Sequence, residues 1–377
     1  MMTGWFRRAR QTRSTVTNRE EAHRQQRLAA CAAYRMLGAI GLIAQLMLWV
    51  TLYAYDRLVQ TTWQAALLLA LPLAGLWALW RGGEGALATQ KGARCTLLLL
   101  LLPCLVLDAA VLIRTLAGYI SQLIPEYPYW ACALVPAVLC WLTALLSREN
   151  GAAYGASLFR LLLPGLFLLA TVFLNTNAHP VRLWPLLGQG PARTAAEALA
   201  GAGSGWGVAL LFVLPLHSRR DDTARPAGER TAGRAALWTA LPWLMCVIWA
   251  LWYAMVRPWR SGDALDVGER LMGLARHSHS PLLYECSGLL WMLLLPLALT
   301  GSAVSGEKLL RSAAPRVPRS IAALIPLLPG TVAALVWPDD LLGALGWALP
   351  WRALLSAAAG GALWALSARK GRKVHAG

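Results

Sequence analysis

Long apolar runs separated by mostly short polar joints occupy almost the whole chain. A membrane-spanning helix needs roughly 20 mostly apolar residues, and runs of about that size recur from residue 36 to residue 368. The pattern predicts ten transmembrane helices, at 36–55, 63–80, 95–117, 130–147, 158–176, 203–217, 235–256, 282–304, 320–337 and 348–368.

The composition supports an all-α integral membrane protein. Hydrophobic residues make up 57% of the 377 residues, charged residues only 14%, and the mean hydropathy is +0.49. A soluble domain cannot bury that much apolar surface. We therefore expect a transmembrane domain at 36–368, preceded by a basic cytoplasmic segment, 1–35, and followed by a basic cytoplasmic tail, 369–377.

The distribution of Lys and Arg predicts the orientation. Cytoplasmic loops are enriched in these residues, and most of the 35 fall in segments that are cytoplasmic if the N-terminus is inside. The few on the opposite side include Arg57, Arg182 and Arg352. Both termini are therefore expected in the cytoplasm, and the net charge of +17 indicates contact with anionic membrane lipids, not with nucleic acid.

The segment 175–207 differs from the other connections. It is long and amphipathic, contains Pro, and ends in GAGSGWG. Irregular backbone within a bilayer is tolerated only where it lines a cavity or packs against protein. We expect 177–202 to be an extracytoplasmic link between two five-helix halves, 36–176 and 203–368, which form a 5+5 inverted repeat of the LeuT type.

Transporters of this kind bind substrate where a discontinuous helix opens each half. Here both helices contain glycines, which we expect to face each other across a pocket. The alternative is that these glycines only permit close helix packing. The candidate ligand-binding residues are Gly38, Gly41, Gln45, Gly201, Gly203, Ser204, Gly205 and Gly207.

Charged residues inside the predicted spans require an explanation, because a charge at the bilayer centre is costly. Asp108 lies in the middle of the third span. It either carries a proton, a cation or a substrate amine, or is protonated or paired with a neighbouring helix. Arg114 lies nearer the outer surface and on a different face. Glu285 opens the eighth span, where a helix N-terminus favours an acid.

Signatures of catalysis and of metal binding are missing from the sequence. It contains no P-loop, nucleophile elbow or HExxH motif, and its seven Cys residues form no CxxC pair. His277 and His279 alone are too few for a metal site. We expect a protein that is not an enzyme and has no cofactor.

A continuous stretch from residue 147 to residue 215 resembles a known family. It contains SRENGAAYGASLFRLLLPG, then RLWPLLGQGP, then a span that ends in FVLPL. This order is similar to that of the permease-like B subunit of bacterial spore germinant receptors. The acid and Trp of the eighth span, Glu285 and Trp291, are similar too. The residues that match the family motif are Gly151, Arg160, Pro164, Leu183, Pro185, Gly190 and Pro215.

The resemblance implies the fold of the amino acid/polyamine/organocation transporter superfamily, with a pocket between helices one and six. It also implies a subunit of the bacterial spore inner membrane that senses an amino acid-like germinant and signals to A and C type subunits. Two alternatives stay open. One is a secondary transporter of amino acids or amines with Asp108 as the coupling group, and the other is a scaffold subunit without a ligand.

Overall fold

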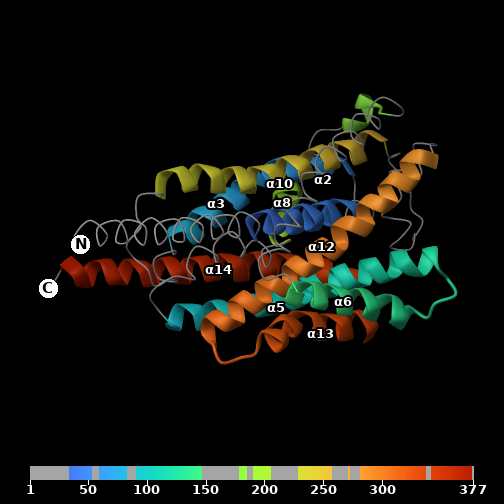
Figure 1. Ribbon diagram of the computed structural model, residues 1–377. Helices are drawn as coiled ribbons and strands as arrows, with labels where there is room; N and C mark the ends of the chain where they lie inside the picture. Colours follow the sequence, from blue (N-terminus) through green and yellow to red (C-terminus); the bar gives the residue numbers. More distant parts are fainter. Residues whose placement is uncertain are drawn as a thin grey trace, which may run out of the picture.

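The protein is an all-helical, multi-pass membrane protein in the part of the chain that the structure describes. The computed structural model describes residues 34–52, 59–82, 91–146, 178–184, 190–204, 228–256, 271, 281–336 and 341–375 (Figure 1). Within these residues, 6 helices are long and apolar enough to cross a membrane. They are Tyr34–Leu52, Thr61–Trp80, Lys91–Leu123, Tyr129–Leu146, Tyr284–Ala313 and Arg319–Val336.

The helices labelled in Figure 1 follow the predicted spans closely. Eight of the ten predicted spans coincide with helices, whereas 158–176 and nearly all of 203–217 lie outside the described residues. The elements are α2 (Val59–Leu68), α3 (Ala70–Gly82), α5 (Lys91–Leu123), α6 (Tyr129–Leu146), η1 (Pro180–Leu183), α8 (Pro191–Ala202), α10 (Gly228–Val256), α12 (Pro281–Ala313), α13 (Arg319–Val336) and α14 (Leu341–His375).

The second predicted span is divided into α2 and α3. Pro72 has no N–H and leaves the carbonyl of Leu68 without its helical partner, and the division follows at Leu69. The N–H of Leu69 donates to the carbonyl of Ala65, and the N–H of Leu73 donates to the carbonyl of Leu69. The two pieces therefore continue as one bent span.

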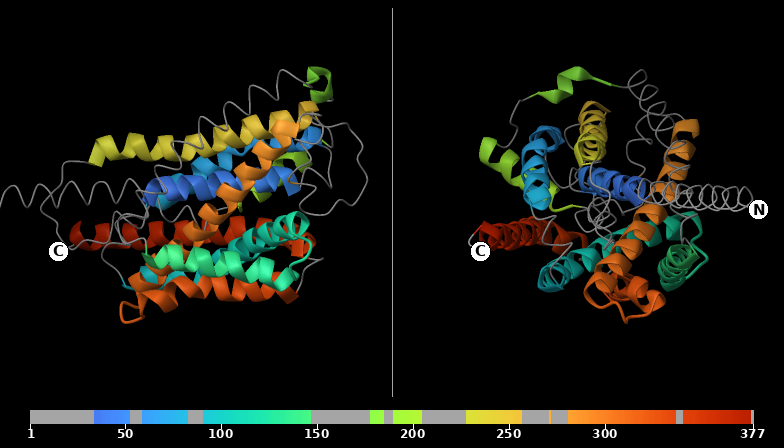
Figure 2. Two further views of the ribbon diagram at one scale, coloured as in Figure 1. Left: turned by 45° about the vertical axis from the view of Figure 1, so that its right-hand side comes forward. Right: turned by 60° about the vertical axis from the view of Figure 1, so that its left-hand side comes forward.

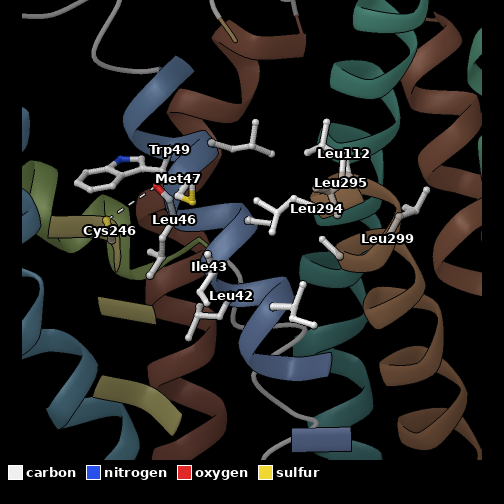
Figure 3. Close-up of a cluster of buried hydrophobic side chains, with 14 of the residues drawn as sticks. Leu42, Ile43, Leu46, Met47, Trp49, Leu112, Cys246, Leu294, Leu295 and Leu299 are labelled. Atoms are coloured by element: carbon white, nitrogen blue, oxygen red, sulfur yellow. Dashed lines mark hydrogen bonds between the residues drawn. The ribbon is translucent and has the colours of Figure 1, made fainter. Parts of the chain in front are cut away.

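The Tyr34–Leu52 helix lies at the centre of the bundle, and 94% of the residues in its most apolar 18-residue stretch are buried. In Figure 3, its Leu46 lies beside Cys246 of α10, while Leu294 and Leu295 of α12 lie on the other side. The helix is unbroken through Gly38 and Gly41, both of which are buried. The expected loosening at these two glycines is therefore wrong, because an apolar helix enclosed by other helices retains its backbone hydrogen bonds.

The helices pack as two groups joined by α14. One group contains α5, α6, α12 and α13, and the other contains α2, α8 and α10. The two groups occupy opposite sides of the bundle in Figures 1 and 2. Helix α14 contacts α5 in the first group and α8 in the second, and it also packs against α3. Among the labelled helices, α14 therefore connects the two groups.

Two helical hairpins, α5–α6 and α12–α13, have the same dimensions. In each, a helix of 33 residues is followed by a five-residue turn and a helix of 18 residues. Every position in 91–146 therefore corresponds to the position 190 residues later. Both turns, 124–128 and 314–318, have Pro at their second and fifth positions and share three corresponding backbone hydrogen bonds.

Candidate functional site

Asp108 of α5 and Arg352 of α14 form a buried ion pair. An Nη2 atom of Arg352 contacts an Oδ1 atom of Asp108, and their side chains are 4% and 0% exposed. Arg352 was expected among the extracytoplasmic cations, and this expectation is wrong. Helix α14 begins at Leu341, seven residues before the predicted start of the last span, so Arg352 lies inside the bundle.

The pair explains how both charges are tolerated within the protein. A lone buried charge is expensive, whereas an oppositely charged partner offsets much of its desolvation. Two interpretations of Asp108 were left open by the sequence. The structure agrees with the one in which Asp108 is paired with a residue of a neighbouring helix. Close packing surrounds the pair: a Cβ at Gly330 of α13 would lie 2.9 Å from Cβ of Ala109 and 3.0 Å from N of Ala110.

Helix α8 brings the glycine-rich segment to the same region. It is preceded by the N-cap residue Gly190, whose φ of 99° is a conformation that favours glycine. The N–H and hydroxyl of Thr194 both donate to the carbonyl of Gly190, and this holds the first turn. Burial increases along the helix until Gly203 and Ser204, which are both buried.

The C-terminal end of α8 lies directly on the α14 face that carries Arg352. A Cβ at Gly203 would collide with the carbonyl oxygen of Leu349 and would lie 3.0 Å from N of Ala353. Residues three, four and seven apart share a helix face, so Leu349, Arg352, Ala353 and Ser356 form one buried stripe. The end of α8 is therefore within about one helical turn of the ion pair.

The same end of α8 also contacts the Tyr34–Leu52 helix. A Cβ at Gly201 would lie 2.9–3.0 Å from the indole of Trp49. Trp49 is eight residues beyond Gly41, which is about 12 Å along a helix. Gly201 therefore lies against Trp49 and not opposite Gly38 and Gly41.

Among the predicted pocket residues, Gln45 has a buried side-chain amide whose hydrogen-bonding needs are not met within the described part of the chain. It precedes Trp49 by one turn and therefore lies on the helix face that meets α8. Its side chain is 6% exposed, and its Nε2 has no hydrogen-bond partner among the described residues. A buried amide left in this way is costly, and this favours a site that a polar ligand completes.

Other residues that the sequence singled out lie away from this site. Arg114 donates a hydrogen bond of 2.8 Å to Oη of Tyr129, and its guanidinium lies 4.9 Å from the centre of that ring. Glu285 is exposed near the start of α12. Leu183 lies in η1, where Arg182 donates to the carbonyls of Met255 and Val256 at the end of α10.

Several predicted site residues have no structural description. The motif residues and the second half of the glycine-rich segment are affected most. Those outside the described residues are Gly151, Arg160, Pro164, Pro185, Gly205, Gly207 and Pro215. Among the residues that are described, no three His, Cys, Asp or Glu side chains are placed to hold a metal ion.

Sequence reasoning missed Arg352 and Trp49 as members of the site. The signal for Arg352 was available, because it lies within the apolar run ALPWRALLSAAAGGALWAL. A charge inside such a run is costly unless it has an oppositely charged partner. No comparable signal existed for Trp49. It was one of many Trp residues near span ends, and only its contact with Gly201 distinguishes it.

The comparisons with known proteins identify the fold and not a family. No protein-family model matches the sequence, and no curated protein gives a match. Solved structures do match. A mutant of the Eremococcus coleocola manganese transporter, H236A, has a TM-score of 0.57 and 16% identity, and the match covers 88% of this chain and 77% of that one. The transporter Mhp1, of the nucleobase-cation-symport-1 family and with bromovinylhydantoin bound, has a TM-score of 0.55 and 12% identity, with 85% and 77% covered.

Both similar proteins are membrane transporters with different cargoes. At such low identity the likeness concerns the fold alone. It extends over most of each chain. This chain therefore has the fold of a multi-pass membrane transporter.

Proposed function

We propose that the protein is a secondary transporter of small organic solutes, with amino acids or amines as the first class to test. The observation that carries the proposal is the transporter fold, matched over 88% and 85% of the chain by two transporters. Fold alone does not define a cargo. Manganese and the hydantoin belong to the similar proteins and are not transferred to this chain.

The two matching hairpins support the proposal, because secondary transporters are often built from two repeated halves. The hairpins α5–α6 and α12–α13 have equal lengths and equal turns. We assign them to corresponding places in two five-helix halves. In a ten-span topology with cytoplasmic termini, α5 would run outwards and α12 inwards, so the two halves would be inverted. Inverted repeats of this kind provide alternating access to a site between them.

The position of the candidate site supports such a mechanism. The end of α8 contacts both the Tyr34–Leu52 helix, which carries Gln45, and the buried face of α14, which carries Arg352. Together with α5, which carries Asp108, these elements come from both halves of the chain and from both helix groups. A movement of one group relative to the other would change the contact between α8 and α14. Asp108 is the residue that we assign to ion coupling.

Uptake by purified protein in proteoliposomes tests transport directly. Labelled amino acids and amines are added outside, with and without an inward proton gradient. Accumulation that depends on the gradient, and that is lost in the Asp108→Asn variant, is the expected result. The matched control is Glu126→Gln, which removes an exposed carboxylate from the α5–α6 turn. Absence of accumulation for every probe at normal protein levels would remove the proposal.

Germinant sensing is the second candidate function, and Gly190 is the observation in its favour. Gly190 closes the motif that resembles the germinant receptor B subunit, and its φ of 99° gives a physical reason for glycine at that position. In this case the ligand would shift the population of two conformations and signal to A and C type subunits in the spore inner membrane. A nutrient response in spores without proteoliposome uptake would favour sensing.

A further inference from the structure

We propose that Arg352 is the binding site for the carboxylate of a small substrate, and that Asp108 occupies this site in the substrate-free protein. Protonation of Asp108 releases Arg352 to the incoming carboxylate. The inference rests on the proposed function and specifies its substrate class and coupling ion. It uses an ion pair that the sequence motifs do not assign.

The first argument is the burial of both charges. Asp108 and Arg352 are 1% and 3% exposed and come from helices in different halves of the chain. Arginine stays protonated in proteins, and its planar guanidinium matches a carboxylate with two parallel hydrogen bonds. A guanidinium with this burial requires an anion beside it. Asp108 is the anion that the structure places there.

The second argument is the charge around the pair. Asp108 faces Cys104 one turn earlier on α5, Arg352 on α14 and the uncharged Gly330 segment of α13. Helix α6 contains no charged residue. The remaining charged side chains of the elements that pack against α5 lie towards helix ends: Arg319 on α13, Glu285, Glu307, Lys308 and Arg311 on α12, and the basic residues after Ala368 on α14.

On α5 itself, the other charged residues are Lys91, Arg94 and Arg114, and Arg114 is engaged with Tyr129. The other buried carboxylate on a described helix that contacts α14 is Glu197 of α8, which takes part in an interaction of its own. We therefore assign the negative charge that replaces a protonated Asp108 beside Arg352 to a group from outside the protein. A substrate carboxylate supplies it, and the charge of the site is unchanged.

The coupling follows from thermodynamic linkage. Because one proton on Asp108 favours one carboxylate on Arg352, the bound carboxylate must favour the proton equally. One proton would enter with each carboxylate, and both would leave together on the other side. A monocarboxylate would then move without net charge, whereas a zwitterionic amino acid would carry one positive charge per cycle.

The third argument is the route by which Arg352 becomes accessible. Gly203 at the end of α8 packs against Leu349 and Ala353, which share the stripe of Arg352 and Ser356 on α14. Separation of α8 from α14 would therefore uncover the stripe that carries Arg352. Gln45 lies on the facing helix, and its Nε2 has no partner in the part of the chain that the structure describes. It is therefore placed to bind a second polar group of the substrate.

Equilibrium binding to the purified protein in lipid nanodiscs tests the inference without transport. The probes are labelled propionate, alanine and alaninamide, which has no carboxylate, each at about pH 5 and about pH 8. We expect the wild type to bind propionate or alanine at least about 10-fold more tightly at the lower pH, and alaninamide not at all. Propionate and alanine distinguish a plain carboxylate from an amino acid.

The variants isolate each partner. Asp108→Asn imitates the protonated acid and should bind the carboxylate equally well at both pH values, whereas Arg352→Gln should not bind it. If Arg352→Gln fails to fold, the neutral double variant Asp108→Asn/Arg352→Gln replaces it and should also not bind. Glu126→Gln should keep the wild-type pH dependence. Absence of carboxylate binding by Asp108→Asn, or binding by the double variant, would overturn the inference.

The two proposals fail in different ways. Binding that follows this pattern without uptake in proteoliposomes would support Arg352 as the carboxylate site and remove the transport function. If an amino acid is taken up at the same rate by the wild type and by Arg352→Gln, and at both pH values, transport is supported and Arg352 is not the carboxylate site.

Discussion

Asp108 and Arg352 each require the other in the interior of the protein. A single charge at the centre of a spanning helix costs about 2.5 to 3.5 kcal/mol on insertion scales, and the pair offsets much of that cost. Breaking a buried pair is therefore worse than replacing it completely, because one charge stays behind without compensation. Single and double variants can therefore separate the cost of an unpaired charge from the loss of the whole pair.

We predict that Asp108→Asn and Arg352→Gln each lower the free energy of unfolding of the ligand-free protein by about 3 to 5 kcal/mol. The double variant should lose clearly less than the sum of the two, because it leaves no uncompensated charge. Denaturant unfolding in detergent micelles measures all four proteins. Additive losses would mean that the two residues do not interact, contrary to their contact.

Gly203 provides a second prediction at the same scale. A Cβ there would collide with the carbonyl oxygen of Leu349, and a backbone atom cannot move aside as a flexible side chain can. We expect Gly203→Ala to separate α8 from α14 and to lower the melting temperature. Gly361 on α14 is the matched control, since a Cβ there meets nothing within 4 Å. Gly361→Ala should be neutral or stabilising by up to about 1 kcal/mol, and equal effects would contradict the close contact.

At the level of elements, the hairpin α12–α13 is held by charges that its counterpart lacks. Oε1 of Glu307 lies 2.9 Å from Nε of Arg319 and 3.3 Å from Nη1 of Arg311. The Glu307 side chain is 4% exposed, whereas Arg319 is 25% exposed. The residue at the corresponding position of α5 is Ala117. The prolines of the two turns are shared, so the charges distinguish the hairpins.

We predict that Glu307→Gln lowers the free energy of unfolding by about 1 to 3 kcal/mol, because Arg319 loses its buried anion while it keeps its bond to the carbonyl of Ala144. Glu126→Gln, at an exposed site in the corresponding α5–α6 hairpin, should change it by less than about 0.5 kcal/mol. Thermal unfolding in detergent compares the two. A similar loss in both would mean that the buried pair adds nothing to the hairpin.

Several elements could be predicted from the sequence because the bilayer imposes a strong rule. Any run of roughly 20 apolar residues must become a helix, so spans such as α6 and α13 were located to within a few residues. The start of α14 was misplaced because GALGWALPW is rich in small residues and Trp, which mark both helices and interfaces. The unbroken helix at Gly38 was missed because glycine permits unwinding without requiring it.

The candidate site was only partly predictable. Asp108, Gln45, Gly201 and Gly203 were selected because polar or small residues are conspicuous in apolar runs. The pairing of Asp108 with Arg352, and of Gly201 with Trp49, depends on which helices become neighbours. Those partners are far apart in the sequence, and hydropathy contains no information on which spans pack together.

At the scale of the whole molecule, the two matching hairpins make the inverted topology testable. Glu126 and Arg316 are exposed and occupy corresponding positions in the turns α5–α6 and α12–α13. We replace each with Cys in a background where Cys31, which lies outside the described residues, and the partly exposed Cys95 and Cys286 are Ser. Because α5 and α12 should cross the membrane in opposite directions, an impermeant maleimide should label Glu126→Cys in intact cells.

Arg316→Cys should be labelled only after the membrane is opened, since the basic turn Ala314–Pro318 is expected in the cytoplasm with both termini. The two variants control for each other, because their turns have the same length and share three backbone hydrogen bonds. Labelling of both from one side would mean that the hairpins run in the same direction. The halves could not then be an inverted repeat, and alternating access would need a different symmetry.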